Sequence, residues 1–332
     1  MVTGKGSISG SKSIGFSIVE STKKQLVRKA GNTALDTTSS IVQEGFAKGS
    51  CDTVVVATMN GYWDALTASA LAGLKRCPVL LTDPNALSSQ AASEIKRLGA
   101  SKVVVAGGNA AVSSRVETSL KRISCVKSVQ RLSGLTAIDT GLALYRSGKG
   151  SWGKTAIVAT SATFQDALSI SPYAYAKKAP IFLANAFTHK LDQETLSAVK
   201  SGGFTRVVIV GGTAAVSKSV ESQLRGISVV RLSGATAYET SSEIASWCVS
   251  QGMKADNMGI ATGRSYYDAL TGSALCGKKG AVLVLVDDAN RSTIDAFVKR
   301  QKKAIYRTFV FGGEAAVSEA TASYISKAIK AT

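Results

Sequence analysis

The stretch VVIVGGTAAVS, residues Val207–Ser217, occurs in two further versions, VVVAGGNAAVS at Val103–Ser113 and FVFGGEAAVS at Phe309–Ser318. The first glycines of the three versions stand 104 and 101 residues apart. Each version opens with a short apolar run of the length of a buried strand. The paired glycines permit a sharp turn, and the closing serine suits the N-cap of a following helix. The sequence therefore predicts a strand–turn–helix unit that is repeated three times.

Each repeat also contains an apolar run that ends in threonine and is followed six residues later by Asp-Ala-Leu. The threonines and aspartates are Thr58 and Asp64, Thr160 and Asp166, and Thr262 and Asp268. Aspartate suits a helix N-terminus, both as a cap and through the helix dipole. A second run, apolar at nearly every position, then predicts a strand buried on both faces of a parallel sheet. Strands alternating with helices predict doubly wound α/β units with right-handed crossovers.

We expect three Rossmann-like or flavodoxin-like modules with parallel sheets, at residues 27–125, 126–227 and 228–332, after an N-terminal lead-in at 1–26. The lead-in holds one stretch of strand-like alternation, Phe16–Val19. The strands that end in RLSG, at Arg131–Gly134 and Arg231–Gly234, border two modules each. The sequence leaves open which neighbour each of these strands joins.

The composition favours a polyanionic partner. Among 332 residues, 40 are Lys or Arg and 22 are Asp or Glu, which gives a net charge of +18. Such a balance suits nucleic acid, an acidic membrane face or an anionic wall polymer, and surface lysines kept for solubility are the simpler alternative. No apolar run approaches the length that crosses a bilayer, so we expect no membrane insertion. The first residues lack the apolar core of a signal peptide, which leaves a cytosolic protein or one whose leader has been removed.

The five cysteines are Cys51, Cys77, Cys125, Cys248 and Cys276, and no CxxC pair occurs among them. This spacing argues against a metal cluster and against thioredoxin chemistry. Cys248 with Cys276, and Cys51 with Cys125, are candidate disulfides. Buried free thiols are an equally good interpretation.

No pattern indicates a cofactor or a catalytic centre. The Gly-Gly turns match neither GxGxxG nor GxxxxGK[ST], so they are a weak nucleotide signal. Asp64 with Asp83, and Asp268 with Asp287, are acid pairs that suit a divalent cation, but the middle repeat has Asn185 in place of the second acid. His189 is the single histidine, so no nucleophile has a repeated histidine partner. We therefore expect no cofactor, no metal site and no enzyme.

Polar and basic groups do gather where parallel strands end, the edge at which open α/β sheets bind ligands. Arginine grips phosphate and carboxylate with two parallel hydrogen bonds, and the Gly-Gly turns offer backbone N–H groups. The aromatic residue before each Asp-Ala-Leu either stacks on sugar rings or covers the helix start. The candidate polymer-binding residues are Arg28, Arg131, Arg231, Thr58, Thr160, Thr262, Asp64, Asp166, Asp268, Gly108, Gly212 and Gly313.

Taken together, these motifs resemble the cell wall binding repeat type 2 family of Gram-positive surface proteins. The resemblance rests on RLSG-x-TA-x-[DE]-T, the Asp-Ala-Leu helix start, the P-[IV]-x-L strand and the VGG-x-x-AVS turn, in three copies over about residues 27–330. It implies modules packed as a pseudo-threefold trimer within one chain. Two departures stand out: alanine at Ala34, Ala137 and Ala237, where many members carry arginine, and Val282 in place of the strand proline.

The resemblance implies non-catalytic, non-covalent attachment to an anionic secondary cell wall polymer of the teichoic acid kind. We accordingly expect an extracellular, wall-bound monomer whose leader has been removed, with no nucleic acid partner. Tethering three weak sites raises avidity by orders of magnitude, which gives the repetition a purpose. Two alternatives remain: a metal- or nucleotide-dependent enzyme of phosphoryl chemistry, and an adhesive scaffold that binds proteins.

Overall fold

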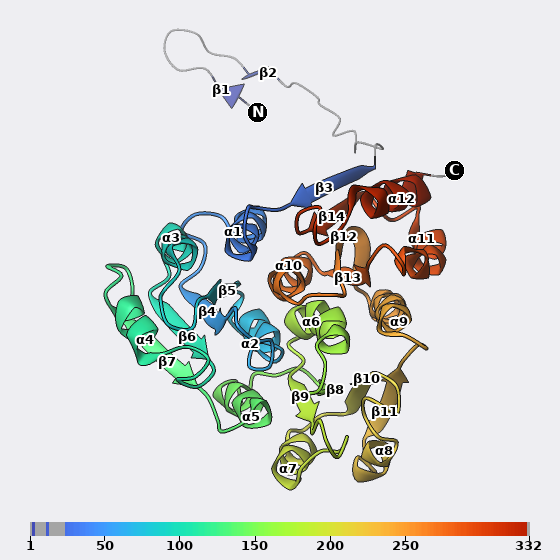
Figure 1. The fold of residues 1–332 in the computed structure, drawn as a ribbon, viewed down its shortest axis with the longest axis horizontal. Coiled ribbons are helices and arrows are strands. Elements are labelled where there is room, and N and C mark those ends of the chain that lie inside the picture. Colours follow the sequence, from blue (N-terminus) through green and yellow to red (C-terminus); the bar gives the residue numbers. More distant parts are fainter. Residues whose placement is uncertain (1, 4–10, 13–23, 331–332) are drawn as a thin grey trace.

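The computed structural model describes residues 2–3, 11–12 and 24–330 (Figure 1). The strand-like stretch Phe16–Val19 lies outside these residues. Near the N-terminus, β1 (Val2–Thr3) and β2 (Ser11–Lys12) form a short antiparallel pair. The remaining strands form three separate parallel sheets of four strands each, which confirms the predicted α/β modules. None of the described helices is long and apolar enough to span a bilayer.

The first sheet has the strand order β5-β4-β6-β7. Its strands and the helices that connect them are, in chain order, α1 (Ala34–Gly45), β4 (Thr53–Thr58), α2 (Ala68–Lys75), β5 (Val79–Thr82), α3 (Ser89–Leu98), β6 (Lys102–Ala106), α4 (Ser114–Lys121) and β7 (Ser128–Leu132). Strand β4 is buried at all of its positions, as expected for a parallel sheet covered by helices on both faces.

The second sheet repeats this order as β11-β10-β8-β9. Its elements are α5 (Ala137–Ser147), β8 (Thr155–Thr160), α6 (Gln165–Lys177), β9 (Ile181–Ala184), α7 (Gln193–Ser201), β10 (Arg206–Val210), α8 (Ser219–Gln223) and β11 (Ser228–Leu232). The strands β7 and β11, which end in RLSG, thus pair with the sheet that precedes them in the chain.

The third sheet takes its last strand from the other end of the chain. Its order is β13-β12-β14-β3, and β3 (Gln25–Lys29) lies parallel to β14 from Arg307↔Gln25 to Phe311↔Lys29. The other elements are α9 (Ala237–Ser250), β12 (Lys254–Thr262), α10 (Tyr267–Lys278), β13 (Ala281–Val286), the 3₁₀-helix η1 (Arg291–Ile294), α11 (Asp295–Gln301), β14 (Arg307–Phe311) and α12 (Glu319–Lys330). The repeat therefore closes into a ring (Figure 1).

The helix after each RLSG-type turn starts in the same way in all three repeats. Thr33, Thr136 and Thr236 are N-caps, and each forms a capping box with the acidic residue three positions later. A capping box satisfies two of the backbone N–H groups that a helix start leaves free. These helices, α1, α5 and α9, pack against α10, α2 and α6, which belong to the neighbouring sheet. The sequence thus fixes both where these helices begin and where two modules meet.

Helices α2, α6 and α10 contact one another on the pseudo-threefold axis at the centre of the ring (Figure 1). At their N-terminal ends Tyr62, Phe164 and Tyr266 form a triangle, with ring centroids 5.2, 5.5 and 5.7 Å apart. Edge-to-face contacts at such distances stabilise aromatic pairs. These rings cover the helix starts, as one of the two interpretations of the sequence expected, and they also contact each other.

Hydrogen bonds around this aromatic triangle link the modules in a cycle. Tyr62 donates to the carbonyl of Ala162 at 2.8 Å, and Tyr266 donates to the carbonyl of Met59 at 3.0 Å. In the middle module the aromatic residue is Phe164, which has no hydroxyl, and Gln165 Nε2 instead donates to the carbonyl of Gly263 at 3.1 Å. Each module is therefore tied to the next at the axis.

The largest apolar cluster runs through all three modules, although the sheets are separate. It includes Val55 of the first sheet, Ile157 of the second and Ile260 of the third, all fully buried. A second, smaller cluster fills the outer side of the second module. All five cysteines are free thiols, so neither candidate disulfide is formed.

The ring closure predicts that β3 protects β14. A chain that begins at Ala30 lacks β3, and we expect its β14 amides to exchange with deuterium roughly tenfold faster or more, because they open locally once their partner strand is gone. Hydrogen exchange with mass spectrometry measures this directly. A chain that begins at Lys24 keeps β3 and is the control. Equal protection of β14 in the two chains would contradict the closure.

Candidate functional site

The strand order sets up the same crevice in each sheet. The chain leaves the first and third strands of a module in opposite directions, and ligands of open α/β sheets bind outside the carboxyl ends of such a strand pair. In the first sheet the pair is β4 and β6. Thr58 ends β4, and Gly107 and Gly108 directly follow β6. The predicted threonine, aspartate and Gly-Gly turn are thus brought together.

The aspartate of Asp-Ala-Leu lies against the first glycine of the turn. These glycines, Gly107, Gly211 and Gly312, have φ angles of 116°, 103° and 102°. A Cβ atom added to any of them would come within 2.6 Å of an aspartate Oδ2 atom, which belongs to Asp64, Asp166 and Asp268 respectively. Glycine is required here both by the backbone conformation and by the carboxylate beside it.

Two of these carboxylates are buried without a partner. Asp166 and Asp268 are each 7% exposed, and neither forms a hydrogen bond with another described residue. Burial raises the pKa of each to about 6, because the charged form loses its hydration. Burial also raises the pKa of Asp64, and a hydrogen bond from Thr140 offsets part of the effect. Their oxygen atoms remain able to accept hydrogen bonds from a ligand.

The expectation that these aspartates cap helices is wrong. The N-caps of α6 and α10 are Phe164 and Tyr266, and neither helix has a side-chain cap. Asp166 and Asp268 lie two residues further, in the first turn. There they are near the positive end of the helix dipole, while their carboxylates face the glycine turn.

The candidate threonines shape the turns that follow their strands. Each hydroxyl oxygen accepts a hydrogen bond from the backbone N–H two residues later, at 3.0 to 3.2 Å. The side chains of Thr58, Thr160 and Thr262 are all buried. Such local bonds favour a tight turn over a continued strand. The threonines thus hold the crevice in shape.

The three candidate arginines lie beside the glycine turns but belong to the next repeat. Arg131 donates to the carbonyl of Gly107 at 2.8 Å, Arg231 to that of Gly211 at 3.0 Å, and Arg28 to that of Gly312 at 3.0 Å. Each also forms an ion pair with a glutamate in the helix after the turn, Glu117, Glu221 or Glu319. Arg28, which comes from the first repeat, therefore lies in the site of the third module, beside Gly312 and not beside Thr58 and Asp64.

These hydrogen bonds and ion pairs occupy much of the hydrogen-bonding capacity of each guanidinium group. The side chains of Arg28, Arg131 and Arg231 are only 23, 17 and 15% exposed. Hydrogen bonds from a charged donor to backbone carbonyls are strong, and here they fix the strand of one repeat to the turn of another. The part of these arginines in polymer binding stays a prediction.

The second glycine of each turn is open to solvent. A Cβ atom added to Gly108, Gly212 or Gly313 would meet nothing within 4 Å. In the described part of the chain their backbone N–H groups have no hydrogen-bond partner. Free N–H groups at a glycine turn before a helix suit an anionic or hydroxyl oxygen.

One crevice is a distinct pocket of about 230 Å³. Thr58, Asp64 and Trp63 line it, together with Asn60 and Ala111. Trp63 is 49% exposed, and its ring stacks on Tyr62 at a centroid distance of 4.6 Å. Sequence reasoning missed Trp63 because the repeat does not preserve it: Gln165 and Tyr267 occupy its place.

Other exposed groups lie on the same face, which we call the carboxyl-end face because its loops follow the carboxyl ends of the strands. Among the residues that the structure describes, three large apolar side chains are exposed: Trp63, Leu135 and Phe187, which follow β4, β7 and β9. Exposed cations on these loops and helix starts that form no ion pair with a described residue include Arg115, Lys190, Lys218 and Arg264. The face thus combines aromatic surface with unpaired positive charge.

In each acid pair that suited a metal, the second acid forms hydrogen bonds within its own part of the fold instead. Asp83 accepts hydrogen bonds from the backbone N–H groups of Asn85 and Ala86. Asp287 accepts hydrogen bonds from Tyr238 and Asn290. Among the residues that the structure describes, no group of three His, Cys, Asp or Glu side chains could hold a metal ion.

Comparisons with known proteins agree with this architecture. The family model of cell wall binding domain 2 (CWB2) matches residues 28–117, 131–221 and 231–322. The chain is 29% identical to the N-acetylmuramoyl-L-alanine amidase LytC of Bacillus subtilis (strain 168) over 266 residues, 80% of this chain and 51% of that protein. It is 32% identical to the amidase enhancer of the same organism over 270 residues, 80% of this chain and 36% of that protein.

Among solved structures, Cwp8 from Clostridium difficile superimposes with a TM-score of 0.82 at 25% identity, over 93% of this chain and 52% of that one. The chain therefore spans about half or less of the length of these relatives. Because the family model matches three segments that make up most of the chain, the chain belongs to the cell wall binding domain 2 family and is a cell wall binding module.

Proposed function

We propose that the chain attaches without covalent bonds to an anionic secondary polymer of the cell wall, of the teichoic acid kind. The observation that carries this proposal is the net charge of +18 on a module of a wall-binding family. Opposite charges steer association and favour a polyanion over neutral glycan. A cell wall binding domain acts at the cell wall or cell surface, and we propose that this chain works there as a monomer with internal pseudo-threefold symmetry.

The polymer engages the carboxyl-end face. A sugar ring stacks on Trp63 in the pocket of the first module, and its hydroxyls donate to Asp64. Phosphate groups accept hydrogen bonds from the free N–H groups of the second glycines and approach cations such as Arg115 and Lys218. Asp166 and Asp268 accept hydrogen bonds from hydroxyl groups of the polymer in the other two modules. Separate contacts for hydroxyl groups and for phosphate groups suit a polymer of sugars or polyols joined by phosphates.

Three linked sites hold a repeating polymer far more tightly than one. Once one module is bound, the other two meet the same polymer at a high effective concentration. Because the modules are fixed around one axis by the aromatic triangle, little conformational freedom is lost when the second and third bind.

We further propose that this segment catalyses no reaction. The second acid of each candidate metal pair, Asp83 or Asp287, is engaged in a loop turn. The aspartate beside the glycine turn occurs three times in the same setting, as expected for a repeated binding contact. The amidase of which this chain is a relative is about twice as long as the matched segment.

The proposal predicts salt-sensitive binding to walls. Binding to purified Gram-positive walls should weaken by about tenfold or more between 0.05 and 0.5 M NaCl, because salt screens exposed charges. Walls stripped of anionic polymer should not bind, and no soluble wall fragments should be released. Sedimentation of labelled chain with the walls measures the binding. Undiminished binding to stripped peptidoglycan would rule the proposal out.

Trp63 tests the pocket. Trp63→Ala should weaken wall binding roughly three- to tenfold, which corresponds to about 1 kcal/mol of lost aromatic contact. Leu135→Ala removes an apolar side chain that is fully exposed on the same face, outside the pocket, and is the control. If both variants bind as the wild type does, the pocket takes no part in binding.

The buried aspartates give a prediction in which stability and binding change in opposite directions. The folded-state pKa of Asp166 and of Asp268, about 6, lies above the ordinary value of 3.8. Ionisation therefore opposes folding, and the free energy of unfolding falls as the pH rises from about 4 to about 6. Asp166→Asn and Asp268→Asn should each raise stability at pH 7 by on the order of 2 kcal/mol and flatten this pH dependence, yet weaken wall binding.

Urea unfolding between pH 4 and pH 7.5, with wall binding at pH 7, measures both effects. Asp83→Asn is the matched control, since the middle module carries Asn185 at that position, and it should change neither quantity. Loss of stability at pH 7 in the Asp166 and Asp268 variants would show that the carboxylates support the fold instead.

A further inference from the structure

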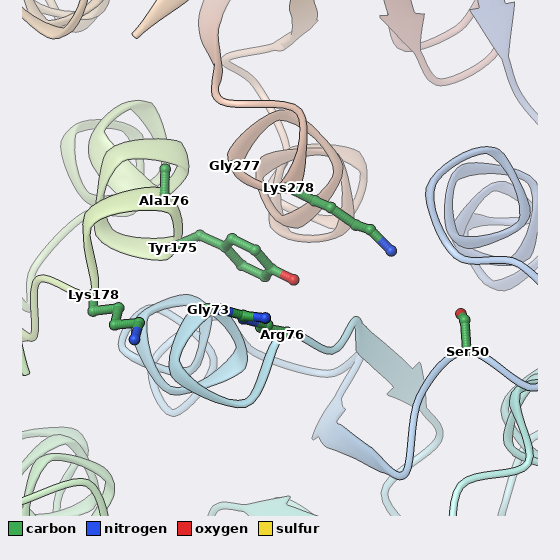
Figure 2. Close-up of a pocket in the computed structure, with 8 residues that line it drawn as sticks. All are labelled: Ser50, Gly73, Arg76, Tyr175, Ala176, Lys178, Gly277 and Lys278. Atoms are coloured by element: carbon green, nitrogen blue, oxygen red, sulfur yellow. The ribbon is translucent and has the colours of Figure 1, made fainter. Parts of the chain in front are cut away.

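The opposite end of the pseudo-threefold axis holds a pocket that the proposed function does not use. It has a volume of about 390 Å³ and lies where the C-terminal ends of α2, α6 and α10 meet. Its lining includes Arg76, Lys178 and Lys278, and none of its eight lining residues is acidic (Figure 2). We call it the axial pocket. It lies on the far side of the ring from the carboxyl-end face, because the helix N-termini form the aromatic triangle on that face.

The repeat is asymmetric at this point. Gly73 and Gly277 are the counterparts of Tyr175, and a Cβ atom on either glycine would overlap atoms of Tyr175. One tyrosine therefore occupies the axis, and two glycines make room for it. Its ring extends between Lys278 and Arg76 toward Ser50 (Figure 2).

The hydroxyl of Tyr175 has no partner. The residue is 5% exposed, and its oxygen is buried without a hydrogen bond to any described residue. Burial raises the pKa of this hydroxyl, so it stays protonated and can donate. A buried hydroxyl without an acceptor is unfavourable, and a ligand oxygen in the pocket would supply one.

The cations of the axial pocket are also unpaired. Arg76, Lys178 and Lys278 form no ion pair with another described residue, although the Lys278 ammonium lies 4.0 Å from the centroid of the Phe46 ring. Arg76 and Lys178 have φ angles of 55° and 52°, a conformation that favours glycine. The third module has Gly280 at the equivalent position, with a φ of 66°. Two modules thus have a cationic residue at a position where the backbone conformation favours glycine.

Stabilisation of helix C-termini by nearby positive charge is the simpler explanation of these cations. It accounts for the charge, but it accounts neither for the hollow nor for the unpartnered hydroxyl. We propose that the axial pocket binds a phosphate-type oxyanion, held by Arg76 and Lys278 with a hydrogen bond from Tyr175, while Lys178 contributes charge at the rim. The anion is either free phosphate or a phosphodiester group of a polymer.

The test is a titration of the whole chain with inorganic phosphate, followed through the backbone amide signals of Gly73 and Gly277 by NMR. We expect saturable shifts of both signals at millimolar phosphate. Tyr175→Phe keeps the ring and should weaken binding several-fold. Arg76→Gly with Lys178→Gly should weaken it at least tenfold while keeping the thermal midpoint at or above that of the wild type, because glycine suits both backbone conformations.

The control carries Lys96→Gln and Lys200→Gln on the peripheral helices α3 and α7, and it should bind phosphate as the wild type does. A parallel titration with a phosphodiester-linked glycerol dimer separates the two sources: tighter binding of the dimer identifies a polymer group, and weaker binding identifies free phosphate. Absence of saturable shifts in the wild type, or equal binding by the Arg76/Lys178 variant and the control, would overturn the proposal. These results do not depend on wall binding.

Discussion

Every sheet in this protein takes its fourth strand from the repeat that follows it, and the third sheet takes it from β3 at the other end of the chain. An arginine on that strand donates to the carbonyl of the glycine turn in the receiving sheet, at 2.8 to 3.0 Å in all three cases. Each site on the carboxyl-end face is therefore built from two repeats. A single repeat would lack both the edge strand and the arginine that holds its turn.

The axis shows how three unequal repeats form one ring. At one end Tyr62, Phe164 and Tyr266 pack in a nearly symmetric triangle, and the hydroxyl that Phe164 lacks is replaced by the amide of Gln165. At the other end the symmetry is broken outright, because one tyrosine displaces two side chains. The apolar core continues between modules, so the three modules pack as one unit that presents its three crevices on one face.

Much of this architecture could be predicted from the sequence. The repeated apolar runs predicted the buried strands and the glycine pairs predicted the turns. Ser113 caps α4 as its position suggested, but the same expectation for Ser217 is wrong, because Lys218 is the N-cap of α8. The partner of each RLSG strand could not be predicted, because a strand between two modules has the same apolar pattern whichever sheet it joins. The closure by β3 pairs residues more than 280 positions apart, and no local signal encodes such a contact.

The site was harder to predict than the fold. The repeated motifs do meet in the folded chain, because each aspartate lies against a glycine turn. The aspartates do not cap their helices, since Phe164 and Tyr266 occupy the cap positions. The carbonyl and glutamate partners of the arginines could not be predicted, because they become neighbours of the arginines only in the folded chain. Trp63 and Tyr175 could not be predicted as site residues from the repeat, because each of them occurs in one repeat only.

The central claim is that three composite crevices on one face hold the same anionic polymer. The most direct measurement is a titration of the chain with purified, length-defined secondary wall polymer, observed through the backbone amide signals of Gly108, Gly212 and Gly313. The account predicts that all three signals shift together and saturate at the same polymer concentration. Shifts confined to one glycine, or found only on the face of the axial pocket, would contradict it.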